Sequence, residues 1–490
     1  MIAPARRVAL EILENIATTD AHSDEQLRTL KVNVLPAQDR NLVTTLVMGT
    51  LRWQLALDQM MIPLLAHPDR PLSQPVRAAL RIGAFQLLHL DRIPPHAVLN
   101  ESVEWVKQSS DPYAAGMVNA VLRKVFKLKD THKTAVAAHP SWMVRRWQKF
   151  YGAENALRIC EYSQQPAPVI LRLVDESTAT ALDCEGALTA PAEWMSRSRR
   201  LLRGDIVSSE LLAHGRLHIQ DQGSQLVAKL ASLAMPTAER VLDACAAPGG
   251  KTAVLAERLP KALITAVDVS ERRYRQMCRN LSQYSDRIFC ILGEAEELAP
   301  KSRYDLILCD APCSGTGTIG RNPEIRLRIL PEDLLSQQQR QIRILTSVAK
   351  ALRPGGRVVY STCSLEQEEN QDVVQAVLEK TSLRLVPIAP MVEELIAENI
   401  LTPLGAEQVR SAVHEEYLRT LPGVHPVDGF FVAVLERPID DPESDAIESG
   451  VIESEVSASG VSASVLAPAS EESLAEESSL EEPSDSIVQS

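Results

Sequence analysis

From Arg240 to Leu435, short apolar runs typical of buried strands alternate with amphipathic stretches typical of helices. The runs cover residues 240–244, 262–268, 288–292, 304–310, 356–362 and 430–435, and helical stretches separate the first five. Because parallel neighbouring strands need a long crossover connection, this alternation predicts a parallel, doubly wound α/β sheet. We place that domain at residues 218–438.

The first quarter of the chain has a different periodicity. Apolar residues recur there at spacings of three and four, as in Val8, Ile12 and Ile16, and prolines separate the periodic segments. This pattern predicts an all-α domain of five to seven helices over residues 1–138. Residues 139–217 combine two short helical patterns with an alternating segment at 168–174. A small α+β domain and a linker subdomain both fit this stretch, and we place a small α+β domain there.

Basic residues gather in the helical region. They are Arg6, Arg7, Lys107, Arg123, Lys124, Lys127 and Lys129. A solvated helix face and a phosphate-contacting surface both explain such a cluster, and the sequence leaves both interpretations open.

The net charge of −13 is concentrated at the end of the chain. Residues 439–490 hold fourteen acids, fourteen serines and no Lys or Arg, which leaves 50 acids against 51 Lys and Arg in residues 1–438. The body is therefore neutral, and its charge does not exclude a nucleic-acid partner. Residues 439–490 also lack aromatic side chains, so we expect a disordered acidic tail.

Several sequence features indicate the cellular compartment. No apolar run approaches the roughly 18 residues of a membrane span, and the first thirty residues lack a secretory signal. The eight cysteines include no CxxC pair, which argues against disulfides and zinc. We expect a cytoplasmic protein without a metal ion.

The segment VLDACAAPGGKT, residues 241–252, predicts a strand, a loop of small residues and the start of a helix. Asp268 ends the next predicted strand, nineteen residues past Gly249, where an acid suits the ribose hydroxyls of a nucleoside cofactor. The Walker pattern fails because Cys245 replaces its first glycine, and GxGxxG is missing as well. A loop without a phosphate signature favours S-adenosylmethionine, whose amino-acid carboxylate would meet the helix N-terminus.

Two further cysteines follow predicted strands. Asp310 ends one strand and Cys313 follows it, while Cys363 follows the next strand. Ligand crevices of such sheets lie at the carboxyl ends of the strands, so both thiols should enter one crevice beside the cofactor. Either cysteine alone would ordinarily be an inert core residue.

A thiolate beside a methyl donor suits one reaction in particular. Carbon 5 of cytosine becomes nucleophilic once a thiolate adds to carbon 6, and it must later lose its proton before the thiolate leaves. A second group is needed for that elimination, and either Cys313 or Asp310 is placed to help.

The motifs DACAAPGGKT, DVSERR, DAPCSGTG and YSTCSLEQEEN resemble those of the bacterial 16S ribosomal RNA cytosine-5 methyltransferases. The helical front end is similar to the NusB RNA-binding fold, and the resemblance covers about residues 1–438. It implies a NusB-like domain, a small middle domain and a Rossmann-like methyltransferase domain. It also implies S-adenosylmethionine as cofactor and cytosine 967 of 16S rRNA as target.

The resemblance implies a role for each site residue. Cys363 would be the nucleophile and Cys313 would assist product release, whereas DNA cytosine-5 enzymes use the Pro-Cys thiol as nucleophile. The implied contacts to the methyl donor are Cys245, Ala246, Ala247, Pro248, Gly249, Gly250, Lys251, Asp268, Arg273, Glu294 and Asp310. Two departures stand out: Glu294 replaces the usual aspartate, and Leu327 replaces a common tryptophan, which bears on the target nucleotide.

We therefore expect a monomer that acts on ribosomal RNA, with no DNA or membrane partner. Methylation of another RNA such as tRNA is an alternative. A non-enzymatic RNA-binding or antitermination factor is a second, although retention of both thiols opposes it. Redox sensing by Cys313 and Cys363 is a third.

Overall fold

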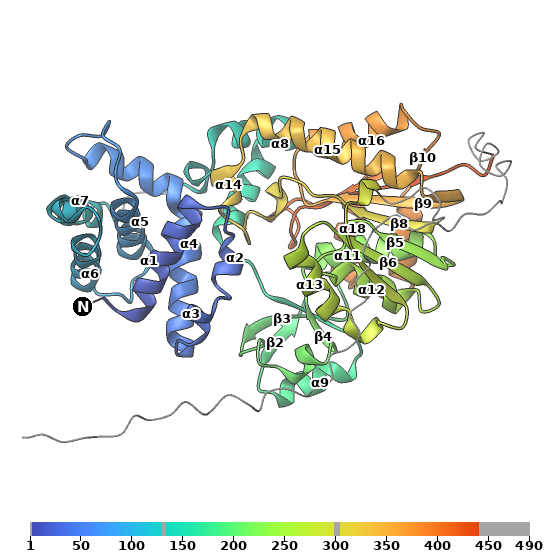
Figure 1. The fold of residues 1–490 in the computed structure, drawn as a ribbon, viewed down its shortest axis with the longest axis horizontal. Helices are drawn as coiled ribbons and strands as arrows, with labels where there is room; N and C mark the ends of the chain where they lie inside the picture. The colour runs from blue at the N-terminus through green and yellow to red at the C-terminus, as the bar shows by residue number, and fades with distance from the viewer. Residues whose placement is uncertain (1, 130–133, 298–303, 441–490) are drawn as a thin grey trace, which may run out of the picture. The chain divides into compact units, whose positions relative to one another are not determined.

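The computed structural model describes residues 2–129, 134–297 and 304–440 (Figure 1). Nearly all of the expected disordered tail lies outside these residues. Among them, no helix is both long and apolar enough to cross a membrane.

The N-terminal region is helical, as predicted. Its α-helices are α1 Pro4–Thr18, α2 Ser23–Gln26, α3 Leu30–Asn33, α4 Ala37–Met61, α5 Gln74–His89, α6 Pro95–Lys107 and α7 Ala115–Phe126. Proline stands in the first turn of α1, α5 and α6, where its missing N–H costs no helical hydrogen bond. Leu46, Leu80 and Leu122 are almost fully buried between the helices and form part of one core.

One member of the predicted basic cluster is not a surface residue. Arg6 on α1 donates to Glu101 on α6 and to Gln86 on α5, both at 2.7 Å, and its side chain is only 11% exposed. The expectation of a solvated or phosphate-contacting Arg6 is therefore wrong, because its charge is used to join three helices. Lys129 is also ion-paired, with Asp91 at 2.7 Å.

The middle region forms a small α+β unit. Its elements are α8 Ser141–Gln164, β1 Ile170–Leu173, α9 Ser177–Cys184, β2 Leu188–Pro191, β3 Ser198–Arg203, α10 Glu210–Ala213 and β4 Leu217–Ile219. The strands form an antiparallel sheet in the order β2-β3-β1-β4. The two short helical patterns merge into α8, which is broken at Gly152, where φ is 83°.

The third region is built on a large sheet. Its strands are β5 Arg240–Asp243, β6 Leu263–Asp268, β7 Ile288–Leu292, β8 Tyr304–Asp310, β9 Leu352–Thr362, β10 Arg384–Val386, β11 Val413–His414, β12 Tyr417–Arg419 and β13 Phe431–Glu436. The order is β11-β12-β13-β9-β8-β5-β6-β7, with β10 paired to β13. Strands β5 to β9 are parallel, and the chain reverses its direction of travel across the sheet at β5 and β8. That switch point is where such sheets bind ligands.

The prediction of a wholly parallel sheet is wrong at one edge. Strand β13 runs antiparallel to β9 over six residue pairs, from Phe431 opposite Thr362 to Glu436 opposite Arg357. Strands β10, β11 and β12 add further antiparallel pairs. Apolar runs and their spacing do not encode strand direction, so the sequence predicted where β13 lies but not which way it runs.

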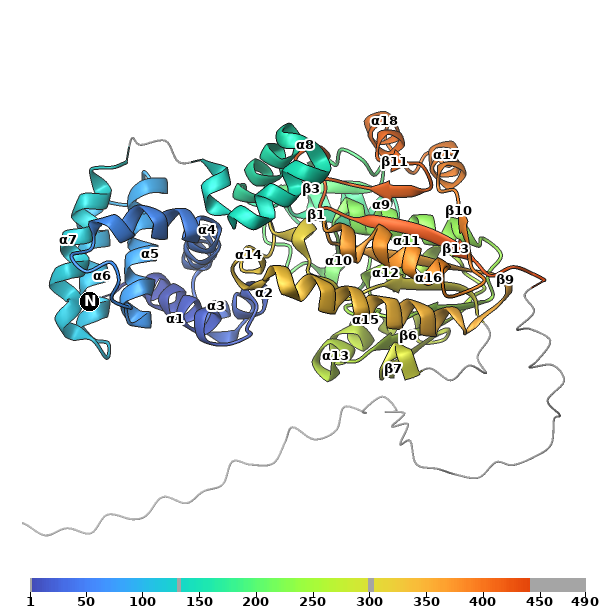
Figure 2. The ribbon, with the colours of Figure 1, turned by 90° about the horizontal axis from the view of Figure 1, so that it is seen from above.

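Helices cover both faces of this sheet (Figures 1 and 2). They are α11 Gln222–Ala234, α12 Gly250–Arg258, α13 Glu271–Asn280, α15 Pro331–Ala349, α16 Gln371–Leu378, α17 Ala389–Ala397 and α18 Pro403–Ser411. The short helix α14 Ile325–Arg328 packs instead against the cores of the N-terminal region and of α8. Helices α11, α12, α17 and α18 share one core with the sheet, and α15 and α16 share another. The all-α, α+β and Rossmann-like fold classes are thus confirmed.

Candidate active site

The loop of small residues connects β5 to α12 at the switch point. Gly249 has a φ of 99°, a conformation that favours glycine, and it immediately precedes the helix. The N–H of Ala246 donates to Val267 of β6 at 2.8 Å, which holds the loop over the sheet edge. The first N–H groups of α12 have no partner within the helix, so they are available to a carboxylate.

Asp268 ends β6 beside this loop and is almost fully buried. Its Oδ1 accepts from the N–H of Ser270 at 2.9 Å and pairs with Arg273 at 3.1 Å. Its Oδ2 has no protein partner within the described residues, so this oxygen is free to accept from a ribose hydroxyl. The loop and this acid therefore fit a nucleoside that carries an amino-acid arm.

Glu294 lies after β7 at the same sheet edge. The preceding Gly293 donates its N–H to the carbonyl of Asp268 at 3.1 Å, so the backbone brings the two acids to adjacent strands. The Glu294 side chain is exposed, and the described residues show no bond between it and the other predicted cofactor residues.

Lys251 and Asp310 form an ion pair at the same sheet edge. The distance from Lys251 Nζ to Asp310 Oδ2 is 2.6 Å, and Ser361 donates to the other carboxylate oxygen at 2.6 Å. Burial lowers the pKa of Lys251, but Asp310 outweighs burial and the net pKa is raised. The Cys363 sulfur also contributes to that increase, so the ammonium group lies within electrostatic reach of this thiol.

The two predicted thiols lie side by side. The sulfur atoms of Cys313 and Cys363 are 3.4 Å apart, after the ends of the neighbouring strands β8 and β9. The hydrogen bond between Cys313 and Cys363, followed by burial, raises the pKa of Cys313 well above its ordinary value. Cys313 therefore keeps its proton at neutral pH.

A buried carboxylate that the sequence analysis missed holds the two thiol loops together. Glu369 accepts from the N–H of Ser314 at 2.8 Å and also from the hydroxyls of Ser314 and Ser364. Gln341 on α15 donates to Glu369 at 3.0 Å and to the carbonyl of Pro312 at 2.9 Å. Glu369 is fully buried, so these bonds fix the residues that flank both thiols.

The sequence contained one signal for Glu369. It lies in the quoted segment YSTCSLEQEEN, where three acids follow Cys363 within six residues. Their number alone suggests a solvated surface, and only the burial of Glu369 distinguishes it. A neighbouring hydrogen bond also holds the segment after Cys363 in place: the side chain of Asn370 donates to the carbonyl of Ser364 at 2.9 Å.

The structure thus brings most predicted site residues to one sheet edge. Lys251, Asp310, Cys313 and Cys363 form one group, and Asp268 pairs with Arg273 beside it. This arrangement of a small-residue loop, a strand-end acid and adjacent thiols on a Rossmann-like sheet is typical of S-adenosylmethionine-dependent methyltransferases.

Comparison with known proteins defines the family more closely. Residues 230–436 match the model of the 16S rRNA methyltransferase RsmB/F family, residues 3–127 match the NusB family, and residues 139–190 match the RsmF/B-like, ferredoxin-like domain. The probable ribosomal RNA small subunit methyltransferase B of Bacillus subtilis is 32% identical over 457 residues, which cover 88% of this chain and 98% of that protein.

A second relative and a solved structure also resemble this chain over most of its length. Ribosomal RNA small subunit methyltransferase B of Xanthomonas campestris is 31% identical over 442 residues, which cover 88% of this chain and 96% of that protein. The crystal structure of PH0851 has the same fold, with a TM-score of 0.72 and 23% identity, and the match covers 89% of this chain and 99% of that one. The chain belongs to the 16S rRNA methyltransferase RsmB/F family. It is an RNA methyltransferase whose methyl donor is S-adenosylmethionine.

Proposed function

We propose that the protein methylates carbon 5 of cytosine 967 in 16S rRNA through a covalent bond between Cys363 and the base. The observation that carries the proposal is the 3.4 Å separation of the Cys313 and Cys363 sulfurs at the switch-point crevice. Two thiols in contact beside a methyl-donor site match a reaction that needs one group to activate the base and a second to release it.

Cys363 is the nucleophile in this mechanism. Its thiolate adds to carbon 6 of the cytosine, which makes carbon 5 an enamine carbon able to take a methyl group. Lys251 lies within electrostatic reach of this sulfur, and its positive charge stabilises the thiolate. When bound, S-adenosylmethionine supplies an electrophilic methyl group.

Cys313 completes the reaction. After carbon 5 has gained its methyl group, its proton must leave while the bond between carbon 6 and Cys363 breaks, which restores the aromatic ring and a free thiolate. Both carboxylate oxygens of Asp310 are engaged, by Lys251 and Ser361, so Cys313 is the better acceptor of that proton. To act as that acceptor, Cys313 first gives its own proton to solvent. This loss is easier once the Cys363 sulfur is bonded to RNA, because the hydrogen bond with Cys363 is the largest cause of the raised pKa of Cys313.

We assign the methyl-donor contacts as the sequence predicted them. The segment from Cys245 to Lys251 would hold the amino-acid arm, and Asp268, oriented by Arg273, would bind the ribose. Asp310 and Glu294 would complete the cofactor site at the ends of their strands. We also propose a cytoplasmic monomer with no DNA or membrane partner, consistent with ribosomal RNA as substrate.

Bisulfite sequencing of total RNA from cells with and without the protein tests the target. We expect 5-methylcytosine at position 967 of 16S rRNA only when the protein is present. If 5-methylcytosine is instead lost from another RNA in cells without the protein, that RNA is the substrate. An unchanged pattern of 5-methylcytosine would contradict the proposed function.

A further inference from the structure

The segment that follows the Cys313 loop lies against the helical N-terminal domain. Gly317 donates its N–H to the carbonyl of Cys363 at 2.9 Å, and Asn322 donates to the carbonyl of Thr318 at 2.9 Å. Residues 320–328, which we term the seam segment, follow at once. They carry charged side chains that the reaction itself does not use.

Arg326 joins three parts of the chain from the interior of the seam segment. Its guanidinium is fully buried and donates to the carbonyls of Arg52 on α4, Ala138 and Ser163 on α8, at 3.2 to 3.3 Å. Arg52 in turn donates to the carbonyl of Gly320 at 3.0 Å. The seam segment and the longest helix of the N-terminal domain thus exchange hydrogen bonds in both directions.

Glu324 makes a second buried connection. Its carboxylate is 1% exposed and accepts from both the N–H and the hydroxyl of Ser23, each at 2.9 Å, at the first residue of α2. Leu327, the residue that departs from the family pattern, packs against the core of the N-terminal domain. The replacement of the common tryptophan by Leu327 therefore falls at the contact between the seam segment and the N-terminal domain.

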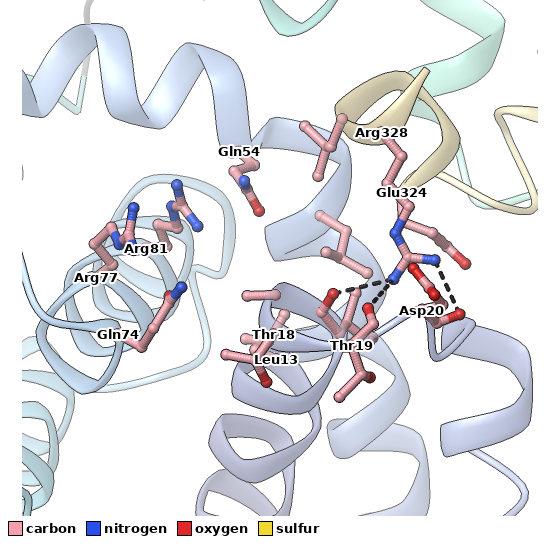
Figure 3. Close-up of a pocket in the computed structure, with 14 residues that line it drawn as sticks. Leu13, Thr18, Thr19, Asp20, Gln54, Gln74, Arg77, Arg81, Glu324 and Arg328 are labelled. Atoms are coloured by element: carbon pink, nitrogen blue, oxygen red, sulfur yellow. Dashed lines mark hydrogen bonds between the residues drawn. The ribbon is translucent and has the colours of Figure 1, made fainter. Parts of the chain in front are cut away.

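Arg328 makes the third connection, at the edge of a cavity of about 640 Å³ (Figure 3). It donates to the carbonyls of Ile16 at 3.0 Å and Ala21 at 2.7 Å, at the end of α1 and just beyond it. Arg77 and Arg81 from α5 line the cavity opposite it. These polar bonds add to the apolar packing of Leu327 against the N-terminal core.

We propose that the seam segment aligns RNA held by the N-terminal domain with Cys363, and that Glu324, Arg326 and Arg328 are positioning residues for the substrate. Glu324 and Arg326 are buried charges, and removing one partner of a buried charge is costly, whereas Arg328 is half-buried and adds its bonds to the end of α1. Together these contacts define one orientation of the two domains. A fixed orientation gives RNA bound by one domain a high effective concentration at the other. The inference rests on the proposed function and extends it to the way in which a long RNA substrate is positioned.

Substrate length separates positioning from chemistry. In Arg328→Gln, the KM for a long 16S rRNA fragment should rise about tenfold, the usual effect of losing a charge-assisted hydrogen bond, with kcat within about twofold. A short stem-loop that reaches only the crevice should keep its KM. Arg328→Lys, which still donates to carbonyls, should restore much of the loss.

The experiment measures transfer of tritiated methyl groups to both RNAs by the full-length protein, so it does not depend on which atom is methylated. Glu324→Gln is the second variant, and Arg410→Gln is the matched control, because within the described part of the chain Arg410 pairs only with exposed Glu393 on the catalytic domain. Melting temperature and S-adenosylmethionine affinity check that the fold and crevice are intact.

The outcomes are distinct. A KM increase confined to the long RNA supports the proposal. Equal losses on both RNAs, or no change in either variant, would overturn it. Bisulfite analysis of the wild-type products tests the proposed function separately: transfer without 5-methylcytosine would refute that function and leave the length dependence measurable.

Discussion

The sulfur atoms of Cys313 and Cys363 lie 3.4 Å apart, although the residues are 50 positions apart in the chain. The parallel pairing of β8 and β9 produces this contact, because Asp310 and Ser361 are partners in the register at the strand ends. Each thiol then leaves its strand two or three residues later. The contact is therefore a consequence of sheet register.

Cys363→Ala should abolish methyl transfer while S-adenosylmethionine affinity stays nearly unchanged. The thiol activates the base and is not one of the assigned methyl-donor contacts, although Lys251 lies within its electrostatic reach. Tritium transfer and isothermal titration of the cofactor measure the two effects. Transfer within about tenfold of wild type would contradict Cys363 as nucleophile.

Cys313→Ala should stall after methyl transfer and leave RNA bonded to Cys363. Because the bond is covalent, a slowly migrating band should survive reducing denaturing electrophoresis. The band should disappear after ribonuclease treatment and in the double variant with Cys363→Ala.

The same gel separates the alternatives. If Cys313 were the nucleophile, as in a DNA-type mechanism, Cys313→Ala would form no adduct. A scaffold protein would form none in any variant. A redox pair would give bands that depend on reductant and not on RNA.

Glu369→Gln should destabilise the protein by roughly 1–3 kcal/mol and lower kcat. The amide would place an N–H donor against the donors of Ser314, Ser364 and Gln341, which now converge on a carboxylate. Urea unfolding and methyl transfer measure the change. The exposed Glu393→Gln is a suitable control, and equal behaviour of the two variants would show that the buried network does not support the site.

Asp243→Asn should change the pH dependence of stability. Burial raises the pKa of Asp243 to about 7, although Thr252 donates to its Oδ2 at 2.7 Å. A raised folded-state pKa gives stability that is complete below the unfolded pKa of about 3.9 and is lost as pH rises to about 7.

The asparagine variant lacks this titration. The unfolding free energy of wild type minus that of the variant should therefore fall between about pH 4 and pH 7, by at most about 1.4 kcal/mol per pH unit. Denaturant unfolding at several pH values measures it. Parallel curves for the two proteins would show that Asp243 does not titrate in this interval.

The sequence predicted the elements that carry a local signal. Strands β6 and β8 end at Asp268 and Asp310 as expected, because strong apolar runs stop there at polar residues. The meeting of Cys313 and Cys363 was also predictable, since ends of parallel strands share one sheet edge. The direction of β13 was not, because no local pattern distinguishes antiparallel from parallel pairing at an edge.

Buried charges account for most of what the sequence did not predict. Glu369, Glu324 and Arg326 have the composition of surface residues, yet each is almost fully buried among partners distant in the chain. Arg6 shows the same effect, since it belonged to an expected surface cluster and bonds inside the helical domain. Long-range partners, and not the residue type, decide whether such a charge is buried.

The bond between Ser23 and Glu324 also orders events during synthesis. Ser23 leaves the ribosome 301 residues before its partner, which at roughly 5–20 residues per second corresponds to about 15–60 s. The helical domain therefore folds with the first turn of α2 still uncapped by Glu324. It acquires that partner only as the second half of the nascent chain emerges, so a chain arrested before residue 324 has an RNA-binding domain with no fixed orientation toward its catalytic half.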